Sequence, residues 1–155
     1  MSNILKLTIC ICIPLAIGGI GGYATVEGVK DWYLTLEKPS FNPPNYLFGP
    51  VWTTLYLLMG ISSYLILISA KVELLKKAMG VYAVQLLLNL AWSFLFFKYH
   101  WIGIAFIEII MIWISILFMI LIFYRIDKKA AYLQIPYLIW VSFASALNGA
   151  IWLLN

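Results

Sequence analysis

The chain has 155 residues, of which 65% are hydrophobic and only 10% charged, and its mean hydropathy is +0.99. A composition this apolar excludes a water-soluble globular domain and indicates a membrane protein. The formal net charge is +4, but the lysines are scattered between apolar runs and form no basic face. We therefore expect no binding to nucleic acid.

Charged residues divide the chain into five apolar segments, each close to the roughly 20 residues that a membrane-spanning helix needs. Segments of about ten residues with alternating polarity, which would indicate a transmembrane β-barrel, are not seen. We predict an all-α membrane protein, a single domain over residues 1–155 that is a bundle of five transmembrane helices. A long structured loop joins helices 1 and 2. The approximate predicted spans are residues 7–26, 47–70, 78–97, 101–124 and 130–153.

The first segment has an alternative interpretation as a cleaved signal peptide. Lys6 precedes an apolar stretch that contains the small residues Ala16 and Gly18. Cleavage would leave four spans. The segment stays apolar to Val26 without a polar cleavage region, and Gly18 and Gly22 have the spacing of a helix-packing face, so a membrane helix is favoured.

The basic residues are distributed unevenly between the two ends of the spans. Seven lie in the N-terminus and in the loops 71–77 and 125–129, whereas three, Lys30, Lys38 and Lys98, lie on the other side. By the positive-inside rule the N-terminus is cytoplasmic. The loop 27–46 and the C-terminus are then expected outside.

Polar or aromatic residues occur at similar depth in four of the spans. At about 1.5 Å of rise per residue, Trp52 lies about 8 Å from the outer end of its span, Asn89 about 13 Å, and Glu108 and Asn148 about 10 Å. Polar groups in hydrocarbon need a partner or a cavity, so they usually face the bundle interior. This coincidence predicts one cavity in the outer half of the bundle, open toward the loop.

Residues spaced four apart support shared helix faces in three spans. The stripes are Phe48, Trp52, Tyr56 and Gly60; Gln85, Asn89 and Ser93, with Trp92 beside them; and Trp140, Ala144 and Asn148. Ordinary helix packing explains any single stripe, whereas three stripes together with Glu108 favour a pocket. For Glu108 itself, packing is favoured over snorkelling to the interface or facing the pocket.

Residues for catalytic or metal chemistry are few. His100 is the only histidine, and Cys10 and Cys12 lie on different faces of the first span. We predict no metal site, and the absence of a Ser-His-Asp set or paired carboxylates disfavours hydrolytic chemistry. His100 is expected to be an interfacial residue, with axial ligation of a haem iron as the alternative.

A specific motif occupies the loop and the start of the second span. It consists of Trp32-Tyr33, Lys38-Pro39-Ser40-Phe41-Asn42-Pro43-Pro44 and Gly49-Pro50-Val51-Trp52-Thr53-Thr54-Leu55-Tyr56. Further matching residues are Gln85, Asn89, Trp92, Pro136-Tyr137-Leu138, Trp140, Phe143-Ala144 and Leu147-Asn148. Over nearly its whole length the chain resembles the translocator protein family, also called tryptophan-rich sensory proteins or peripheral-type benzodiazepine receptors.

The resemblance implies a membrane receptor or sensor that binds tetrapyrroles, such as protoporphyrin IX or haem-like molecules, and aromatic drug-like ligands in a pocket capped by the loop. Porphyrin is implied as a ligand, and no cofactor is required. The carboxylates of a porphyrin are expected to point outward, toward Lys30, Lys38 or Lys98. With Asn148 from the depth argument, the predicted ligand-binding residues are Tyr33, Trp52, Asn89, Trp92, Trp140, Ala144 and Asn148.

Two other functions compete with the receptor. One is a light-dependent porphyrin-degrading enzyme, with Trp52 and Trp140 as catalytic residues acting through electron transfer or radical chemistry. The other is a structural or partner-binding bundle whose pocket is incidental. A variant of the receptor hypothesis is that the receptor also transports porphyrin or another small molecule.

The resemblance also bears on partners and location. It implies a homodimer, although the third span offers Gly80 and Ala83 without a small-xxx-small repeat. A cholesterol role is not expected, because no tyrosine followed by a basic residue occurs after Leu147. The short chain is more similar to bacterial than to mitochondrial members, which places it in the cell membrane as a multi-pass protein.

Overall fold

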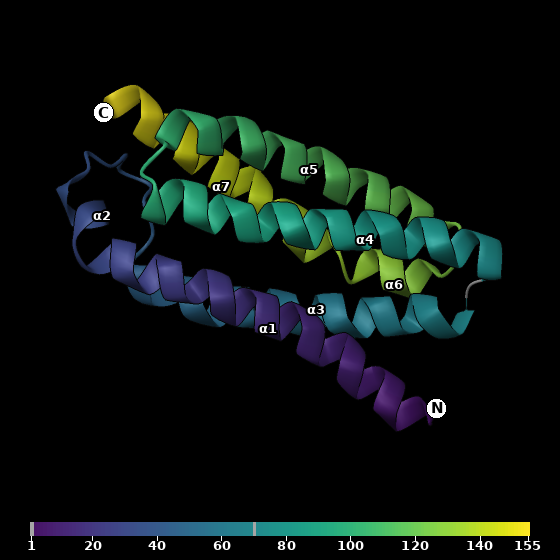
Figure 1. Cartoon of the computed structure of the whole chain (residues 1–155). Coiled ribbons are helices and arrows are strands. Elements are labelled where there is room, and N and C mark those ends of the chain that lie inside the picture. The colour runs from purple at the N-terminus through teal and green to yellow at the C-terminus, as the bar shows by residue number, and fades with distance from the viewer. Residues whose placement is uncertain (1, 70) are drawn as a thin grey trace.

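The computed structural model describes residues 2–69 and 71–155 and contains helices and no strand within these ranges (Figure 1). Residue 1 of the predicted domain and residue 70, the predicted end of the second span, lie outside the described residues. Five helical segments are long and apolar enough to cross a membrane. The predicted all-α membrane bundle of five transmembrane helices is confirmed.

The long helices run side by side, and successive ones alternate in direction (Figure 1). The N-terminal end of α1, the C-terminal end of α3 and the α5–α6 connection lie at one end, which we call the Lys-rich end; α2, the α4–α5 turn and the C-terminus lie at the other. The helices are α1 (Asn3–Lys30), α2 (Trp32–Thr35), α3 (Phe48–Ser69), α4 (Val72–Ser93), α5 (Ile102–Tyr124), α6 (Lys128–Tyr132) and α7 (Ile135–Leu154), with a 3-10 turn η1 (Asn45–Leu47) and a π-helical turn η2 (Phe94–Lys98).

Two helices extend well beyond the predicted membrane spans. The helix α1 continues to Lys30, so the loop begins at residue 31 rather than 27. The helix α4 begins at Val72, six residues before the predicted start at residue 78, and its second turn contains Lys76 and Lys77. Charged residues mark where a chain leaves the hydrocarbon, but they do not end a helix, because long lysine side chains reach the membrane surface from helical backbone.

The predicted fifth span, residues 130–153, is divided into two helices. The carboxylate of Asp127 caps α6 by accepting hydrogen bonds from the backbone N–H groups of Lys129 (2.7 Å) and Ala130 (3.0 Å). Pro136 lies in the first turn of α7, where its missing N–H costs no helical hydrogen bond. The proline therefore starts a new helix after α6 has ended.

Two clusters of buried side chains hold the bundle together. The larger one joins α3, α4, α5 and α7 and contains Met59, Ile66 and Met119, all fully buried. The smaller one, which contains Tyr33, Phe96 and Leu147, attaches the loop to η2 and to the C-terminal half of α7. In a bilayer such helix contacts are stabilised by close packing rather than by exclusion of water.

Candidate ligand-binding pocket

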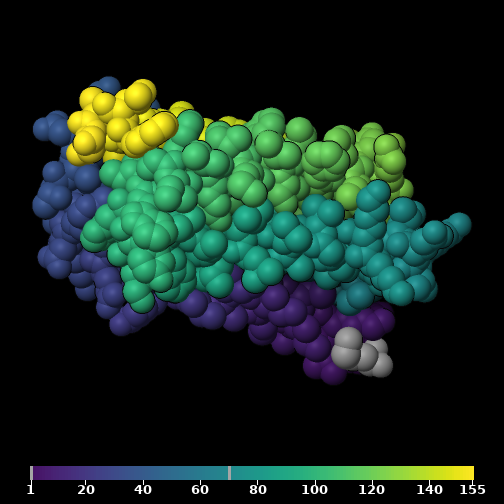
Figure 2. All heavy atoms as spheres, turned by 45° about the horizontal axis from the view of Figure 1, so that its top comes forward, coloured from purple at the N-terminus to yellow at the C-terminus, as the bar shows by residue number. Residues whose placement is uncertain are grey.

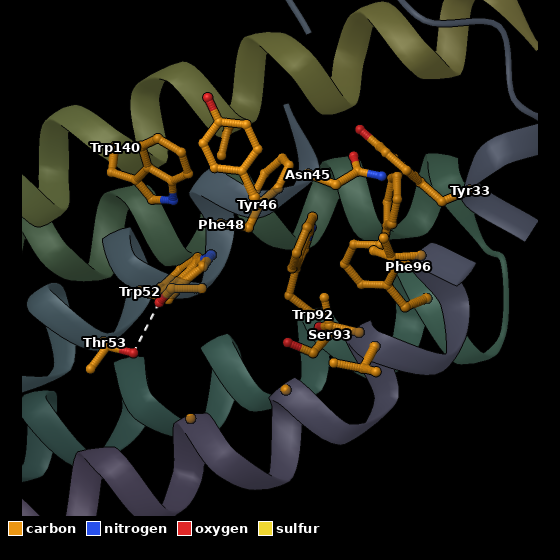
Figure 3. A pocket seen from close by; sticks show the side chains of 18 of the residues that line it. Tyr33, Asn45, Tyr46, Phe48, Trp52, Thr53, Trp92, Ser93, Phe96 and Trp140 are labelled. Carbon is orange, nitrogen blue, oxygen red and sulfur yellow. Dashed lines mark hydrogen bonds between the residues drawn. The ribbon is translucent and has the colours of Figure 1, made fainter. Parts of the chain in front are cut away.

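A cavity of about 680 Å³ opens between α1, α3, α4 and α7, beneath the α1–α3 loop (residues 31–47) (Figure 3). This volume lies within the range of small-molecule sites. Among the described residues, α5 contributes none to the lining. The aromatic lining residues are Tyr33, Tyr46, Phe48, Trp52, Tyr56, Trp92, Phe96, Phe97 and Trp140.

Neighbouring rings hold the tryptophans of this cavity in place. Trp52 stacks on Tyr56 with ring centroids 5.5 Å apart, and Trp92 stacks on Phe96 at 5.2 Å. Trp52 and Trp140 lie on one side of the cavity in Figure 3, and Trp92 and Phe96 lie on the other. Aromatic pairs of this kind contribute about 0.5–1.5 kcal/mol each beyond the area that they bury. The cavity therefore has preformed aromatic walls.

The π-helical turn η2 brings two consecutive phenylalanines to the pocket. The backbone N–H of Tyr99 donates to the carbonyl of Phe94 at 2.9 Å, which is the five-residue spacing of a π turn. Phe96 and Phe97 are both buried, with centroids 4.9 Å apart, and both line the cavity. Such π turns are rare and are often found at functional sites.

Few polar groups reach the cavity, and one of them is fixed. The side chain of Asn148 accepts a hydrogen bond from the indole Nε1 of Trp92 (3.1 Å) and donates one to the carbonyl of Ile102 (3.1 Å). The indole Nε1 of Trp140 is buried and has no hydrogen-bond partner among the described residues. A buried donor without a partner is uncommon, since most are satisfied by protein, water or ligand.

Of the three cations expected to face a ligand, only Lys30 lines the cavity within the described part of the chain. The ammonium of Lys38 instead donates to the backbone carbonyls of Tyr33 (2.7 Å) and Leu36 (2.8 Å). The ammonium of Lys98 lies 5.6 Å from the ring centroid of Phe94. Lys38 thus stabilises the loop rather than facing the cavity.

Tyr33 anchors the loop over the pocket. Its side chain is buried, and its hydroxyl donates to Oδ1 of Asn42 at 2.7 Å across the loop. Burial raises the pKa of Tyr33 to about 12, because the ionised phenolate would lose its hydration. The hydroxyl therefore stays protonated, and able to donate, at all physiological pH values.

Further contacts attach the loop to the ends of the bundle. The side chain of Asn155 bonds the backbone of Glu37 twice, accepting from its N–H (3.0 Å) and donating to its carbonyl (2.9 Å). The ring of Trp32 stacks on His100 with centroids 4.1 Å apart. His100 has φ 59°, in the left-handed region, at the tight turn before α5. It lies in this stack at the end of the bundle.

A sequence model of the TspO/MBR family matches residues 10–153. The chain belongs to this family. It is 42% identical to the tryptophan-rich protein TspO of Chlorobaculum tepidum, over 99% of this chain and 98% of the relative. It is 37% identical to the translocator protein of Homo sapiens, over 81% of this chain and 75% of the relative. The tryptophan-rich sensory protein of Cereibacter sphaeroides is 34% identical, over 76% and 73%.

Membership of the TspO/MBR family confirms the resemblance seen in the loop motif. Together with the five apolar helices it identifies a multi-pass membrane protein. The sensory and translocator names of the relatives support a membrane receptor or sensor role.

The structure of this TspO/MBR protein brings most of the predicted site residues together. The predicted residues that line the cavity are Tyr33, Trp52, Trp92, Trp140, Ala144 and Asn148. The exception is Asn89, which is buried between helices: its Oδ1 accepts from the hydroxyl of Tyr56 (2.6 Å), and its Nδ2 donates to the hydroxyl of Tyr137 (3.1 Å). Because Tyr56 itself lines the cavity, Asn89 supports the wall from behind.

The depth argument also grouped Glu108 with the pocket, and the structure corrects this. Glu108 is on α5, which lies outside the lining, and it is buried with no hydrogen-bond partner for either carboxylate oxygen among the described residues. Depth along a helix does not fix the direction around its axis, so two groups at equal depth can face different neighbours.

The sequence argument missed that α1 forms one wall of the cavity. Gly18 and Gly22 were expected to form one packing face, but only Gly18 does so: a Cβ there would overlap the ring of Tyr56. At Gly22 a Cβ would have no neighbour within 4 Å, and this residue lines the cavity together with Gly19. The run of glycines was the available signal, since it leaves space as well as permitting close approach.

Proposed function

We propose that this protein is a membrane receptor or sensor that binds tetrapyrroles, such as protoporphyrin IX or haem-like molecules, and other planar aromatic ligands in the cavity beneath the loop. The observation that carries the proposal is that Trp52, Trp92 and Trp140, from three different helices, line one cavity of about 680 Å³. A flat aromatic ligand is bound best by rigid aromatic walls, with a few polar groups to orient it.

The charged end of a porphyrin has one partner in this proposal. Lys30 lies at the end of α1 and lines the cavity, so it is the cation that would pair with the propionate carboxylates. Porphyrin is the ligand here, and the proposal requires no cofactor.

Binding is tested by titrating the purified protein in detergent with protoporphyrin IX in the dark. We expect a saturable complex, and Trp140→Leu should weaken it roughly 30-fold, since a central aromatic anchor contributes about 2 kcal/mol. The matched control is Trp152→Leu on the same helix, because Trp152 is half exposed and packs on Phe106 away from the cavity. An unsaturable signal, or equal losses in both variants, contradicts the proposal.

A second candidate is light-dependent degradation of a bound porphyrin. It is favoured by the presence of both Trp52 and Trp140 in the lining of one cavity, where either indole could exchange an electron with the photoexcited ligand. The absorbance of the complex in light and dark, for the wild type, Trp52→Phe and Trp140→Phe, tests it. If the wild type bleaches porphyrin no faster than detergent alone does, the enzyme function fails. Transport is tested separately by flux into proteoliposomes.

The proposal places the protein in the cell membrane with the N-terminus in the cytoplasm and the α1–α3 loop and C-terminus outside. The support is the excess of Lys and Arg at the Lys-rich end of the bundle. Labelling of single cysteines introduced at Ser2 or Asn155, in a variant whose native Cys10 and Cys12 are replaced by alanine, with a membrane-impermeant reagent tests this orientation in intact cells. A homodimer is part of the proposal on the strength of the family resemblance, without an assigned interface, and cholesterol binding is not.

A further inference from the structure

Two glutamine side chains are completely buried deep in the bundle. Gln85 on α4 and Gln134, the residue that precedes α7, are both 0% exposed. Neither the amide oxygen nor the amide nitrogen of either side chain has a hydrogen-bond partner among the described residues. The hydroxyl of Tyr82, also on α4 and 4% exposed, has no partner among these residues either.

The face of α4 that carries two of these side chains is directed toward α7. Tyr82, Gln85 and Asn89 are spaced three and four residues apart, so they lie on one face of α4. The amide of Asn89 donates to the hydroxyl of Tyr137 on α7 at 3.1 Å. The unpaired groups of Tyr82 and Gln85 are therefore on the side of α4 that faces the centre of the bundle.

Gln134 lies at a depth similar to that of Gln85. The helices α4 and α7 both run from the Lys-rich end toward the opposite end (Figure 1). Gln85 is four residues before Asn89 and Gln134 is three before Tyr137, which is about 6 Å and about 4.5 Å at 1.5 Å per residue. The carbonyl of Gln134 accepts from the N–H of Leu138 (3.1 Å), so this residue keeps helical spacing. Both amides thus lie about one turn nearer to the Lys-rich end than the hydrogen bond of Asn89.

Leaving these groups without partners would be costly. A glutamine amide has two N–H donors and an acceptor oxygen, and the hydrocarbon of a bilayer offers no partner for them. The helices α4 and α5 run side by side across one face of the molecule, teal and green in Figure 2, and solvent reaches neither glutamine. Four amide atoms and a hydroxyl without partners would together remove a large share of the stability of a folded protein. A polar partner inside the bundle is therefore required.

We propose that the core of the bundle binds a small cluster of ordered water molecules between α4 and α7, held by the amides of Gln85 and Gln134 and by the hydroxyl of Tyr82. Buried waters commonly bond to several polar groups that otherwise have no partner. Each water can donate and accept, so it joins two amides that do not contact each other. The cluster continues the hydrogen bonds of Asn89 toward the Lys-rich end and stabilises the packing of α4 on α7.

Gln85 and Gln134 are the only glutamines in the chain, so the proposed site can be observed selectively. The full-length protein is labelled with ¹⁵N at the glutamine side chains and measured by NMR in detergent. Gln85→Leu and Gln134→Leu each remove one side-chain amide signal and thereby assign both. We expect nuclear Overhauser cross peaks from both amides to water in the wild type, with the sign that long-lived bound water gives.

The thermal stability of the leucine variants gives a second measurement, whose sign depends on whether the amides have partners. If water binds the amides, Gln85→Leu or Gln134→Leu removes hydrogen bonds, and the unfolding temperature should fall by at least about 3 °C. If the amides have no partners, each leucine removes an unsatisfied group and the unfolding temperature should rise. The matched control is Met119→Leu on α5, a fully buried apolar side chain whose replacement at similar volume should change little. Circular dichroism in the same detergent measures all of these proteins.

Several results would overturn the proposal. Cross peaks between the two amides without one to water would show a direct bond between Gln85 and Gln134. Water cross peaks at only one amide, or at neither, would exclude a shared cluster. Cross peaks that grow with pH as hydroxyl exchange does would show relay through Tyr82 rather than bound water. A leucine variant more stable than the wild type would show amides without partners.

Discussion

Replacing Asn89 with leucine tests the arrangement behind the pocket wall. The amide of Asn89 joins the hydroxyls of Tyr56 and Tyr137, which are 7% and 1% exposed, through hydrogen bonds of 2.6 and 3.1 Å. Asn89→Leu leaves both hydroxyls without this partner. Single hydrogen bonds between membrane helices average about 0.6 kcal/mol, whereas leaving a buried polar group unsatisfied costs about 1–3 kcal/mol. For two hydroxyls we expect a loss of about 1–3 kcal/mol in the free energy of unfolding.

The same reasoning predicts that further substitutions restore the stability lost. In Tyr56→Phe/Asn89→Leu/Tyr137→Phe no hydroxyl is left unsatisfied, and replacing all partners with apolar groups of similar shape is nearly neutral. We expect this triple variant to lie within about 1 kcal/mol of the wild type. Unfolding in detergent with increasing denaturant, followed by circular dichroism, measures all three proteins. A triple variant no more stable than Asn89→Leu would refute the account.

Three further predictions concern the cavity and its loop. Gly22→Leu should leave the free energy of unfolding unchanged within about 0.5 kcal/mol. It should reduce the affinity for protoporphyrin IX at least tenfold, measured by the dark titration in detergent, because the leucine side chain enters the empty space of the cavity. Gly18→Leu should instead lower the stability of the protein, because the new side chain meets the ring of Tyr56. Asn155→Ala should remove about 1–3 kcal/mol of loop attachment through two lost hydrogen bonds, seen as faster hydrogen exchange of residues 31–47 and faster ligand release, and unchanged rates would contradict it. The pKa of Tyr33 is raised from 10.0 to about 12 in the folded protein, so the contribution of Tyr33 to stability is complete below pH 10 and is lost as the pH rises to about 12. The difference in tyrosinate absorbance between the wild type and Tyr33→Phe measures the ionisation of Tyr33. Ionisation of Tyr33 at pH 10 would refute the prediction.

Most of the fold was predictable from composition because the bilayer imposes strong constraints. Every backbone polar group in hydrocarbon must be satisfied within its own segment, so long apolar runs become helices. The ends of helices were less predictable, since they depend on local capping. Asp127 caps α6 and Pro136 starts α7, so one apolar segment contains two helices. Lys76 and Lys77, which the sequence suggested lie in a loop, are part of the continuous helix α4.

The candidate pocket was predictable in outline but not in detail. Helical periodicity on α3 and α7 selected Trp52 and Trp140, the family resemblance added Trp92, and these three residues lie together. Depth counting failed for Asn89 and Glu108, because equal depth does not determine which neighbour a side chain faces. The tertiary arrangement alone decided that.

The sequence by itself determined that this is a multi-pass helical membrane protein of the TspO/MBR family, because apolar length and a specific loop motif are both local properties of the chain. Only the tertiary structure decided that α1 forms a wall, that Gly22 faces empty space, and that Asn155 holds Glu37 across 118 residues of sequence. Those features depend on the rotation of each helix about its axis, which is set by packing among all of the helices at once and is not encoded in any one of them.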